Sequence, residues 1–194
     1  EDIYLDGKIV LSRQDILLPG DHNVENYMAA ILAVEVPVTP AHIRQTARSF
    51  GGVAHRTELV RTVKGVRYYN DSIASTPTRT AAGLKCFPEK VILIAGGYDK
   101  HIPYDVLGPE VCAHVKKLFL CGATAPQIRA AVEKCAGEKP EMTDCGDFES
   151  AVRAAAAAAE SGDVVLMSPA SASFDQFKNF MVRGECFKKI IMEL

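Results

Sequence analysis

The sequence predicts an α/β fold whose sheet is parallel or mostly parallel. After residue 55, short apolar runs alternate with longer segments that have the pattern of helices. The run over 91–95 is continuously apolar, as expected for a strand that is buried on both faces of a sheet. Strands that alternate with helices form a parallel sheet with the helices packed against it.

The first 52 residues have a different pattern. Asp6-Gly7 stands between two short apolar runs and predicts a β-hairpin. Two stretches with helical spacing follow, and Gly51-Gly52 then marks a hinge or a domain boundary. The elements expected here are a hairpin over 3–11, a helix over 24–36 that residues 21–23 can cap, and a helix over 39–50 with Ile43, Ala47 and Phe50 on one face.

The remaining elements follow in alternation. Strands are expected over 56–60, 66–70, 91–95, 117–121 and 163–168. Helices are expected over 77–87, 103–113, 125–135, 149–160 and 174–194. Pro77 stands near the first turn of its helix, where a proline fits. The alanine run over 154–159 fits a helix that packs closely on a sheet.

Composition places the chain among globular proteins and excludes two classes of partner. Its 194 residues are 48% hydrophobic and 24% charged, which is ordinary for a protein with a packed core. The net charge of −2 gives no basic surplus for binding nucleic acid. No apolar run reaches the roughly 18 residues that a membrane span needs. The chain opens on Glu1 without a methionine, and we expect it to be a piece of something longer.

The cysteines and histidines predict no metal centre. The six cysteines include no Cys-x-x-Cys pair, and the five histidines are scattered along the chain. Most of the cysteines stand beside apolar residues, so we expect buried, reduced thiols of a cytosolic protein. The cysteines are Cys86, Cys112, Cys121, Cys135, Cys145 and Cys186.

Two strand ends carry residues that suit a ligand, because open α/β sheets bind ligands at the carboxyl ends of their strands. Asp71 and Ser75 follow the strand that ends at residue 70; a ligand site and an ordinary capped turn both fit them. Gly96-Gly97 and Lys100 follow the central strand. The glycines let a ligand approach the backbone and the lysine can hold a carboxylate or phosphate, although a tight turn with a surface lysine fits equally.

A third strand end and two isolated sites complete the candidates. Small residues over 168–175 precede a predicted helix start, which suits either an anion site or a helix capped by Ser173. Phe174, Phe177 and Phe180 recur three apart and are expected in the core.

Asn23 and Asn26 share one face at the start of the first helix, where amides read a nucleobase edge or cap the helix. Arg56 follows the Gly51-Gly52 boundary. An arginine at such a junction can clamp a phosphate, although an exposed salt bridge is the commoner role.

Taken in order, five segments of the chain resemble the Mur ligase family. Each segment alone is a weak signal, but the ordered set is specific and covers nearly the whole chain. The most specific segment is the last. The segments are Leu17–Asn26, Val53–Glu58, Tyr69–Ser72, Gly96–Lys100 and Ser168–Phe180, the last continued by Arg183-Gly184.

The resemblance implies a domain organisation. Members of the family have a first domain that binds a UDP sugar, a P-loop ATPase as the second, and a Rossmann-like third domain that brings the incoming amino acid. Residues 1–52 resemble the tail of the P-loop ATPase-type central domain, and 53–194 resemble the whole Rossmann-like C-terminal domain. The phosphate loop, the magnesium-binding acids and the carbamylated lysine of the family have no counterpart in this sequence.

The resemblance also implies a reaction and a set of site residues. ATP and Mg²⁺ in the full-length enzyme would convert UDP-MurNAc-L-alanine to an acyl phosphate, which D-glutamate attacks. By motif match Asn23, Asn26, Arg56 and Asp71 bind the nucleotide, with the two asparagines on the adenine side and the other two across the hinge. Ser75, Lys100, Ser173 and Phe180 surround D-glutamate, with Ser173 and Phe180 acting through backbone N–H groups at a helix start. No catalytic residue is assigned, no cofactor is expected to bind this chain tightly, and the chain alone is expected to be inactive.

The sequence departs from the family pattern at one place, and one alternative function remains. Ile73 follows Asn-Asp-Ser where many family members have lysine, and Ser75 stands where threonine is common. Either another residue replaces that charge or the substrate is held more weakly. The alternative function is a non-catalytic Rossmann-like module that binds an acidic metabolite or a protein partner.

Overall fold

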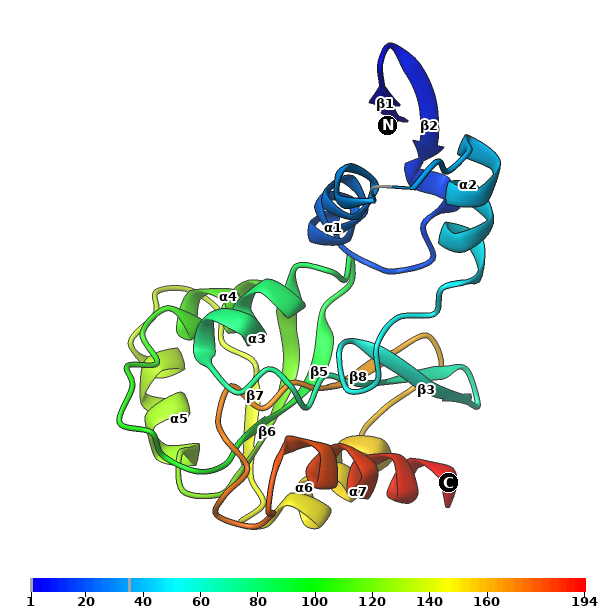
Figure 1. Cartoon of the computed structure of the whole chain (residues 1–194). Helices are drawn as coiled ribbons and strands as arrows, with labels where there is room; N and C mark the ends of the chain where they lie inside the picture. Colours follow the sequence, from blue (N-terminus) through cyan, green and yellow to red (C-terminus); the bar gives the residue numbers. More distant parts are fainter. Residues whose placement is uncertain (1, 35) are drawn as a thin grey trace. The chain divides into compact units, whose positions relative to one another are not determined.

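The computed structural model describes residues 2–34 and 36–194 of the chain (Figure 1). The chain forms two compact units, Glu1–Gly52 (unit 1) and Val53–Leu194 (unit 2). Unit 1 has one small hydrophobic core and unit 2 has two larger ones.

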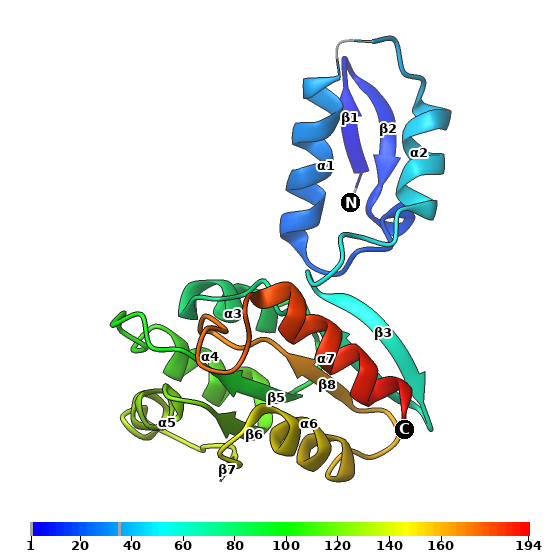
Figure 2. The ribbon, with the colours of Figure 1, turned by 60° about the horizontal axis from the view of Figure 1, so that its bottom comes forward.

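Unit 1 is a hairpin flanked by two helices (Figure 2). Its strands β1 (Asp2–Leu5) and β2 (Lys8–Ser12) pair antiparallel around Asp6-Gly7, which confirms the predicted hairpin. After a 3₁₀ turn, η1 (Arg13–Asp15), come helices α1 (Asp21–Ala33) and α2 (Pro40–Ser49). The first helix begins at Asp21 rather than at residue 24, and residue 35 of the predicted range lies outside the described residues.

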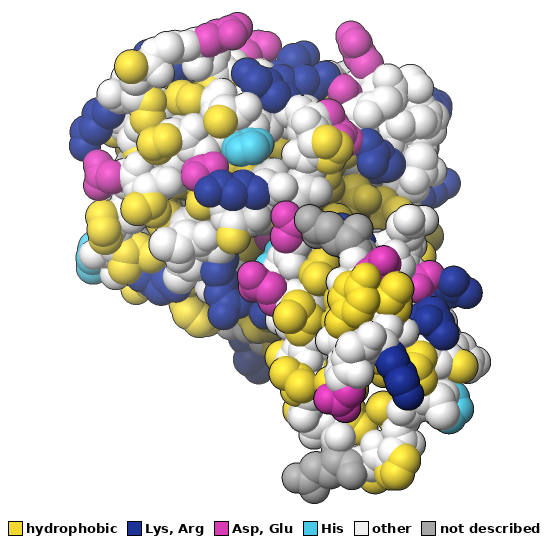
Figure 3. Space-filling model, turned by 90° about the horizontal axis from the view of Figure 1, so that it is seen from above, with side chains coloured by type: hydrophobic (Ala, Val, Ile, Leu, Met, Phe, Trp, Pro, Cys, Tyr) yellow, Lys and Arg dark blue, Asp and Glu magenta, His cyan; other side chains and the backbone are white. Residues whose placement is uncertain are grey.

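The core of unit 1 is small. It consists of Val10, Leu11, Ile16, Ile43 and Ala47. Helix α1 has one buried residue, the polar Asn23, and its Leu32 is 74% exposed. Phe50, expected on the same helix face as Ile43 and Ala47, lies just after α2 and is exposed. Hydrophobic side chains consequently gather on the face of unit 1 that Figure 3 shows.

Unit 2 contains one six-stranded sheet, which confirms the predicted mostly parallel α/β fold. In the sheet order β3-β4-β8-β5-β6-β7, only β3 runs antiparallel to its neighbour. The last strand in the sequence thus lies between the second and third. The strands are β3 (Glu58–Val63), β4 (Val66–Asn70), β5 (Val91–Gly96), β6 (Val115–Cys121), β7 (Glu141–Asp144) and β8 (Val164–Met167).

Five helices cover the two faces of this sheet (Figures 1 and 2). One face carries α3 (Pro77–Leu84), α4 (Leu107–His114) and α5 (Ala125–Glu133). The other carries α6 (Phe148–Ala157) and α7 (Phe180–Met192).

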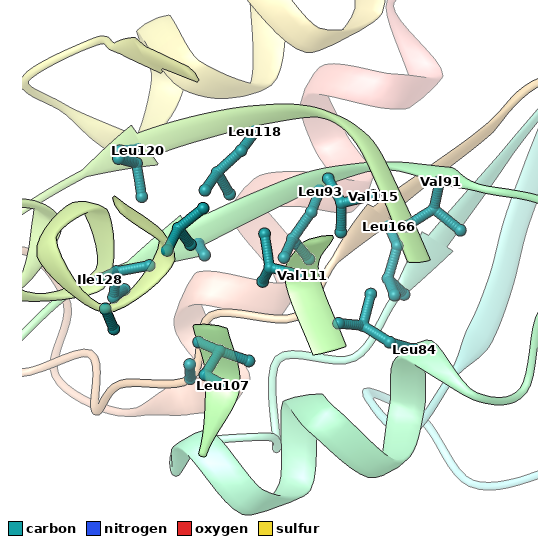
Figure 4. Packing of buried hydrophobic residues seen from close by; sticks show 14 of the residues in the cluster. Leu84, Val91, Leu93, Leu107, Val111, Val115, Leu118, Leu120, Ile128 and Leu166 are labelled. Carbon is teal, nitrogen blue, oxygen red and sulfur yellow. The ribbon is translucent and has the colours of Figure 1, made fainter. Parts of the chain in front are cut away.

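The two cores follow from the alternation of side chains along the central strands. On β5, Leu93 faces the core that holds Leu84, Val111 and Ile128 of the first helix layer (Figure 4). Its neighbour Ile92 faces the other core, beneath α6 and α7. Every residue of β5 is buried, as its apolar run predicted, and each fully buried aliphatic side chain contributes roughly 1.5–3 kcal/mol.

The clearest differences from the prediction concern three elements of unit 2. The last helix begins at Phe180 rather than at residue 174, because Asn179 Oδ1 accepts a hydrogen bond from the N–H of Val182 at 2.9 Å and caps it there. Phe174 is therefore in a loop and 64% exposed, not in the core. Strand β7 was not predicted, and helix α4 begins at Leu107 rather than at residue 103.

Candidate functional site

The candidate site lies at the carboxyl ends of β4, β8 and β5. The loop after β5 leads to α4 on one face of the sheet, and the loop after β8 leads to α7 on the other. Neighbouring strands whose connections diverge in this way leave a crevice where ligands bind. The two loops are also joined directly: the N–H of Tyr98 donates to Ala172 O at 2.8 Å, and the N–H of Gly96 donates to Pro169 O at 2.8 Å.

Asp71 is a buried carboxylate at the end of β4, with 5% of its surface exposed. Its Oδ1 accepts from the N–H of Thr57 at 3.1 Å, and its Oδ2 accepts from Ser168 Oγ at 2.8 Å. Burial raises the pKa of Asp71 to about 6, although these hydrogen bonds and the charge of Arg56 lower it. The carboxyl group therefore holds a proton at weakly acidic pH.

Arg56 is exposed, and it lies close enough to Asp71 for its charge to affect that carboxyl group. The structure thus brings together the two residues of unit 2 that were predicted to bind the nucleotide. An exposed guanidinium next to a carboxylate remains available to a phosphate, since it has five donors.

Ser75 and Ile73 form the turn between β4 and α3. The N–H of Ser75 donates to Ile73 O at 2.8 Å, and the N–H of Ile73 donates to His55 O at 3.1 Å. Both side chains are partly exposed at the carboxyl edge of the sheet. A hydroxyl and an apolar side chain therefore stand here, and neither supplies a positive charge.

Lys100 is exposed in the loop after β5. Gly97 has a φ of +146°, and a Cβ added there would lie 2.3 Å from Ala172 O, so only glycine permits this approach of the two loops. Next to the lysine, Asp99 accepts hydrogen bonds from the N–H of His101 at 2.7 Å and from Gln127 Nε2 at 3.1 Å. This arrangement fixes the base of the loop and leaves the ammonium group in solvent.

Ser173 and Phe180 lie in the segment between β8 and α7. Ser173 is 2% exposed, and its carbonyl accepts from the N–H groups of Gln176 at 3.1 Å and Phe177 at 2.8 Å. The prediction that Ser173 stands at a helix start is wrong, because the segment folds into a turn before α7 begins. Phe180 is the first residue of α7, where backbone N–H groups lack partners within the helix.

The exposed Phe174 has an aromatic partner across the two loops. Its ring meets that of Tyr98 edge-on, with centroids 5.9 Å apart. Both rings are exposed at the carboxyl edge of the sheet. An apolar patch therefore stands beside the loop that carries Lys100.

Arg183 lies in this region and had no role predicted from the sequence. It is 1% exposed, and its guanidinium donates to Ser72 Oγ at 3.1 Å and to Ser72 O at 3.0 Å. It also donates to Ser171 O and Ala172 O, both at 3.1 Å. Burial lowers its pKa to about 10. Arg183 thus ties the loop after β4 to the loop after β8. A lone arginine among the apolar positions of the last helix was the available signal.

His55 and a chain of hydroxyl groups complete the framework. The Nδ1 of buried His55 lies 3.0 Å from Asn70 Nδ2, and a Cβ added at Gly184 would lie 2.2 Å from that ring nitrogen. Ser171 Oγ lies 2.7 Å from Tyr104 Oη and 2.8 Å from Thr124 Oγ1. These contacts join the loops after β5, β6 and β8, and no sequence spacing indicated them.

Asn23 and Asn26 lie side by side in the first turns of α1. Asn23 Nδ2 donates to Pro19 O at 2.7 Å, and Asn26 Nδ2 donates to Asn23 Oδ1 at 3.2 Å. The amide of Asn23 therefore holds the chain that enters the helix. Binding of adenine by these residues stays a prediction.

Over residues 2–34 and 36–194, no group of three or more His, Cys, Asp or Glu side chains forms a metal site. Within the same residues no helix is long and apolar enough to cross a membrane. All six cysteines are free thiols, but only Cys121 is buried, so burial was wrongly predicted for the other five.

Comparisons with known proteins agree with this architecture. A family model described as "Mur ligase, glutamate ligase domain" matches residues 55–171. A relative from Acetivibrio thermocellus named UDP-N-acetylmuramoylalanine--D-glutamate ligase is 52% identical over 197 residues, covering 97% of this chain and 42% of the relative. A relative of the same name from Clostridium botulinum is 48% identical over 195 residues, covering 99% of this chain and 43% of the relative. The chain thus spans less than half the length of these relatives.

A solved structure shows the same fold. The crystal structure of a bifunctional folylpolyglutamate synthase/dihydrofolate synthase from Yersinia pestis, complexed with AMPPNP and a Mn ion, matches with a TM-score of 0.65. The match covers 98% of this chain and 43% of that chain at 17% identity. Since the family model matches more than half of the chain, and the sheet and its loops have the architecture described above, the chain belongs to the Mur ligase family.

Proposed function

We propose that this chain is the C-terminal part of a UDP-N-acetylmuramoylalanine--D-glutamate ligase, which adds D-glutamate to UDP-MurNAc-L-alanine at the expense of ATP. The observation that carries the proposal is the similarity over nearly the whole chain to relatives of that name, 52% in one case. The polar loops at the carboxyl ends of β4, β5 and β8 supply the residues for it.

In the proposed reaction, ATP phosphorylates the carboxylate of UDP-MurNAc-L-alanine, the amine of D-glutamate attacks the acyl phosphate, and phosphate leaves. Positioning of the reactants and electrostatic stabilisation supply most of such catalysis. This sequence has no G-x-x-x-x-G-K-[ST] loop, and its described residues form no cluster of metal ligands. The residues present do not fit Mg²⁺ or an ATP phosphate cradle, so other parts of the ligase would provide both.

The proposed role of unit 2 is to bind and orient D-glutamate. Lys100 would pair with a substrate carboxylate, because its ammonium group is exposed at the end of the central strand. Ser75 would contribute its hydroxyl from the loop after β4. Phe180 would contribute a free N–H at the start of α7, and Ser173 would act from the turn before it rather than from a helix end.

The proposed nucleotide residues are Asn23, Asn26, Arg56 and Asp71. Arg56 supports this role because it keeps an exposed guanidinium beside Asp71. Asp71 would hold Arg56 electrostatically when ionised. The two asparagines would present amide groups to the adenine.

A segment exchange tests the proposal. The homologous segment of the Acetivibrio thermocellus relative is replaced by this chain, and formation of the D-glutamyl product is measured with UDP-MurNAc-L-alanine and ATP. We expect product with D-glutamate and none with L-glutamate. A folded hybrid that forms no product, or accepts other amino acids equally, would overturn the assignment.

The chain by itself is the second arm of this test. We expect no phosphate release from ATP above that of a mock preparation, because transfer of the γ-phosphoryl group needs a phosphate cradle and a metal site. Steady release by the purified chain would show that it contains an ATPase centre of its own. Binding of an acidic metabolite by the chain, with an inactive hybrid, would instead favour a non-catalytic binding module.

A further inference from the structure

Two cysteine thiols lie together at the C-terminal turn of α5, on a part of unit 2 that the proposed site does not use. Cys112 Sγ lies 4.0 Å from Val132 O, and Cys135 Sγ lies 3.4 Å from Ala131 O. The two carbonyls are consecutive in the chain. Cys112 comes from α4 and Cys135 follows α5, so 22 residues separate two side chains that line the same surface pocket.

The close approach of the helices explains this pairing. Gly108 stands four residues before Cys112, so both lie on the same face of α4. A Cβ added at Gly108 would lie 2.8 Å from Cys135 Sγ and 2.3 Å from Ala131 O. Glycine therefore lets α4 approach the end of α5 closely enough for the two thiols to meet.

The Cys135 thiol affects Cys112, and both thiols are only partly buried. Burial raises the pKa of the Cys112 thiol, and the neighbouring Cys135 thiol raises it further through a hydrogen bond and through its charge. Both side chains are only partly buried. They line a surface pocket of about 470 Å³, which is large enough for a small oxidant to enter.

We propose that Cys112 and Cys135 form a dithiol modification site that takes a hydroperoxide as its oxidant and closes to an intramolecular disulfide. The bond would join α4 to the end of α5. The amino ends of the strands lie nearby, because α4 ends at His114, directly before β6 begins at Val115. The site is therefore separate from the loops at the carboxyl ends.

The chemistry balances with one peroxide. The thiolate of Cys135 attacks a peroxide oxygen, the O–O bond breaks, and a sulfenic acid forms while the leaving oxygen takes a proton as water or alcohol. The thiolate of Cys112 then attacks the sulfenic sulfur, an S–S bond forms, and the S–O bond breaks to release water. Two electrons pass from sulfur to the peroxide. Burial raises the pKa of the Cys112 thiol, which disfavours Cys112 as the first nucleophile.

The test uses the reduced full-length chain. One equivalent of hydrogen peroxide is added, free thiols are alkylated, and intact mass and non-reducing peptide maps are recorded. We expect four alkylated cysteines, the loss of two hydrogens, and a linked peptide pair that contains Cys112 and Cys135. Dithiothreitol should restore six alkylated cysteines, and the oxidised chain should unfold at a higher temperature than the reduced chain.

Variants separate this pair from the other cysteines. Cys112→Ser should leave a sulfenic acid on Cys135 that dimedone traps, and Cys135→Ser should form no disulfide and show no thermal shift. Cys145→Ser, a partly exposed cysteine outside the pair, should behave as the wild type. If a serine variant fails to fold, the peptide map of the wild type still identifies which cysteines are linked. Linkage of another pair, disulfide-bonded dimers, or six alkylatable thiols after peroxide would overturn the proposal.

Discussion

Ser168 Oγ donates a 2.8 Å hydrogen bond to Asp71 Oδ2 and so joins the ends of two neighbouring parallel strands, β8 and β4. The carboxyl group that accepts this bond is buried, and its pKa is raised from 3.8 to about 6. A buried acid in that state makes the stability of unit 2 depend on pH.

The sign of this dependence follows from proton binding. Between about pH 4 and pH 6 the folded state keeps the proton on Asp71 while the unfolded state has lost it, so this contribution falls as pH rises. Across that range we expect the free energy of unfolding of the wild type to fall by up to roughly 3 kcal/mol relative to that of Asp71→Asn. This follows from about 1.4 kcal/mol for each unit by which the pKa is shifted. Urea unfolding followed by circular dichroism at pH 4, 5, 6 and 7 measures the difference.

Asp105→Asn is the matched control, since Asp105 is an exposed acid paired with Lys134. The free energy of unfolding of Asp105→Asn should stay within about 0.5 kcal/mol of the wild-type value at every pH. A constant offset between wild type and Asp71→Asn would mean that Asp71 is already ionised across the range.

Arg183 should be important for stability beyond its charge. Arg183→Lys retains the charge but not the planar fork that reaches Ser72, Ser171 and Ala172 together. We expect Arg183→Lys to lower the free energy of unfolding by about 3 kcal/mol or more, because buried acceptors are left without donors. Thermal unfolding measures it. Arg153→Lys, in an exposed pair with Glu149, should change stability by less than about 0.5 kcal/mol, and equal effects would disprove the special role.

Lys100 should determine the affinity for D-glutamate in the assembled ligase. A charge-assisted hydrogen bond to a carboxylate contributes roughly 1.5–3 kcal/mol, so Lys100→Ala should raise the KM for D-glutamate about ten- to a hundred-fold. The KM for ATP should change much less. Steady-state kinetics of the hybrid enzyme decide this, with Lys134→Ala as the surface control. A large loss on ATP alone would reassign Lys100 to the nucleotide.

Helix α1 should exchange its amide hydrogens faster than β5. Its one buried residue is polar, and its side chains Val24, Tyr27 and Ile31 are only partly buried against a small core, whereas every residue of β5 is buried. We expect protection in 24–33 to be lower than in 91–95 by roughly two orders of magnitude. Exchange followed by mass spectrometry compares the two segments in one sample. Equal protection would mean that α1 is held as firmly as the central sheet.

The sequence predicted the parts of the fold whose local and tertiary preferences agree. The apolar run at 91–95 can be stable only as a buried strand, and it is one. Residues 174–179 have a helical pattern, but Ser173 accepts two turn hydrogen bonds and Gln176 Oε1 accepts from the N–H of Phe148 at 3.0 Å. Those partners are distant in the sequence or depend on the turn, so spacing alone placed the helix start six residues too early.

Weak signals explain the other differences. Strand β7 is four residues long at the sheet edge, and among its side chains only Met142 packs on a core, so it has no alternating pattern. Arg56 and Asp71 were predicted from separate motifs, and the fold brings them together. Arg183 was named only as part of a motif and was given no role, because one arginine in an amphipathic helix ordinarily faces solvent. Its role depends on loops 11 and 111 residues away.

The place of β8 between β4 and β5 has a consequence for synthesis of the protein. A ribosome makes residues 164–167 after every other strand, so a nascent chain that ends before them has β4 and β5 with no strand between them. Both would offer open, apolar edges to other chains, which favours aggregation. The sheet can close only when its central gap is filled, and folding of unit 2 therefore waits until residues 164–167 have emerged.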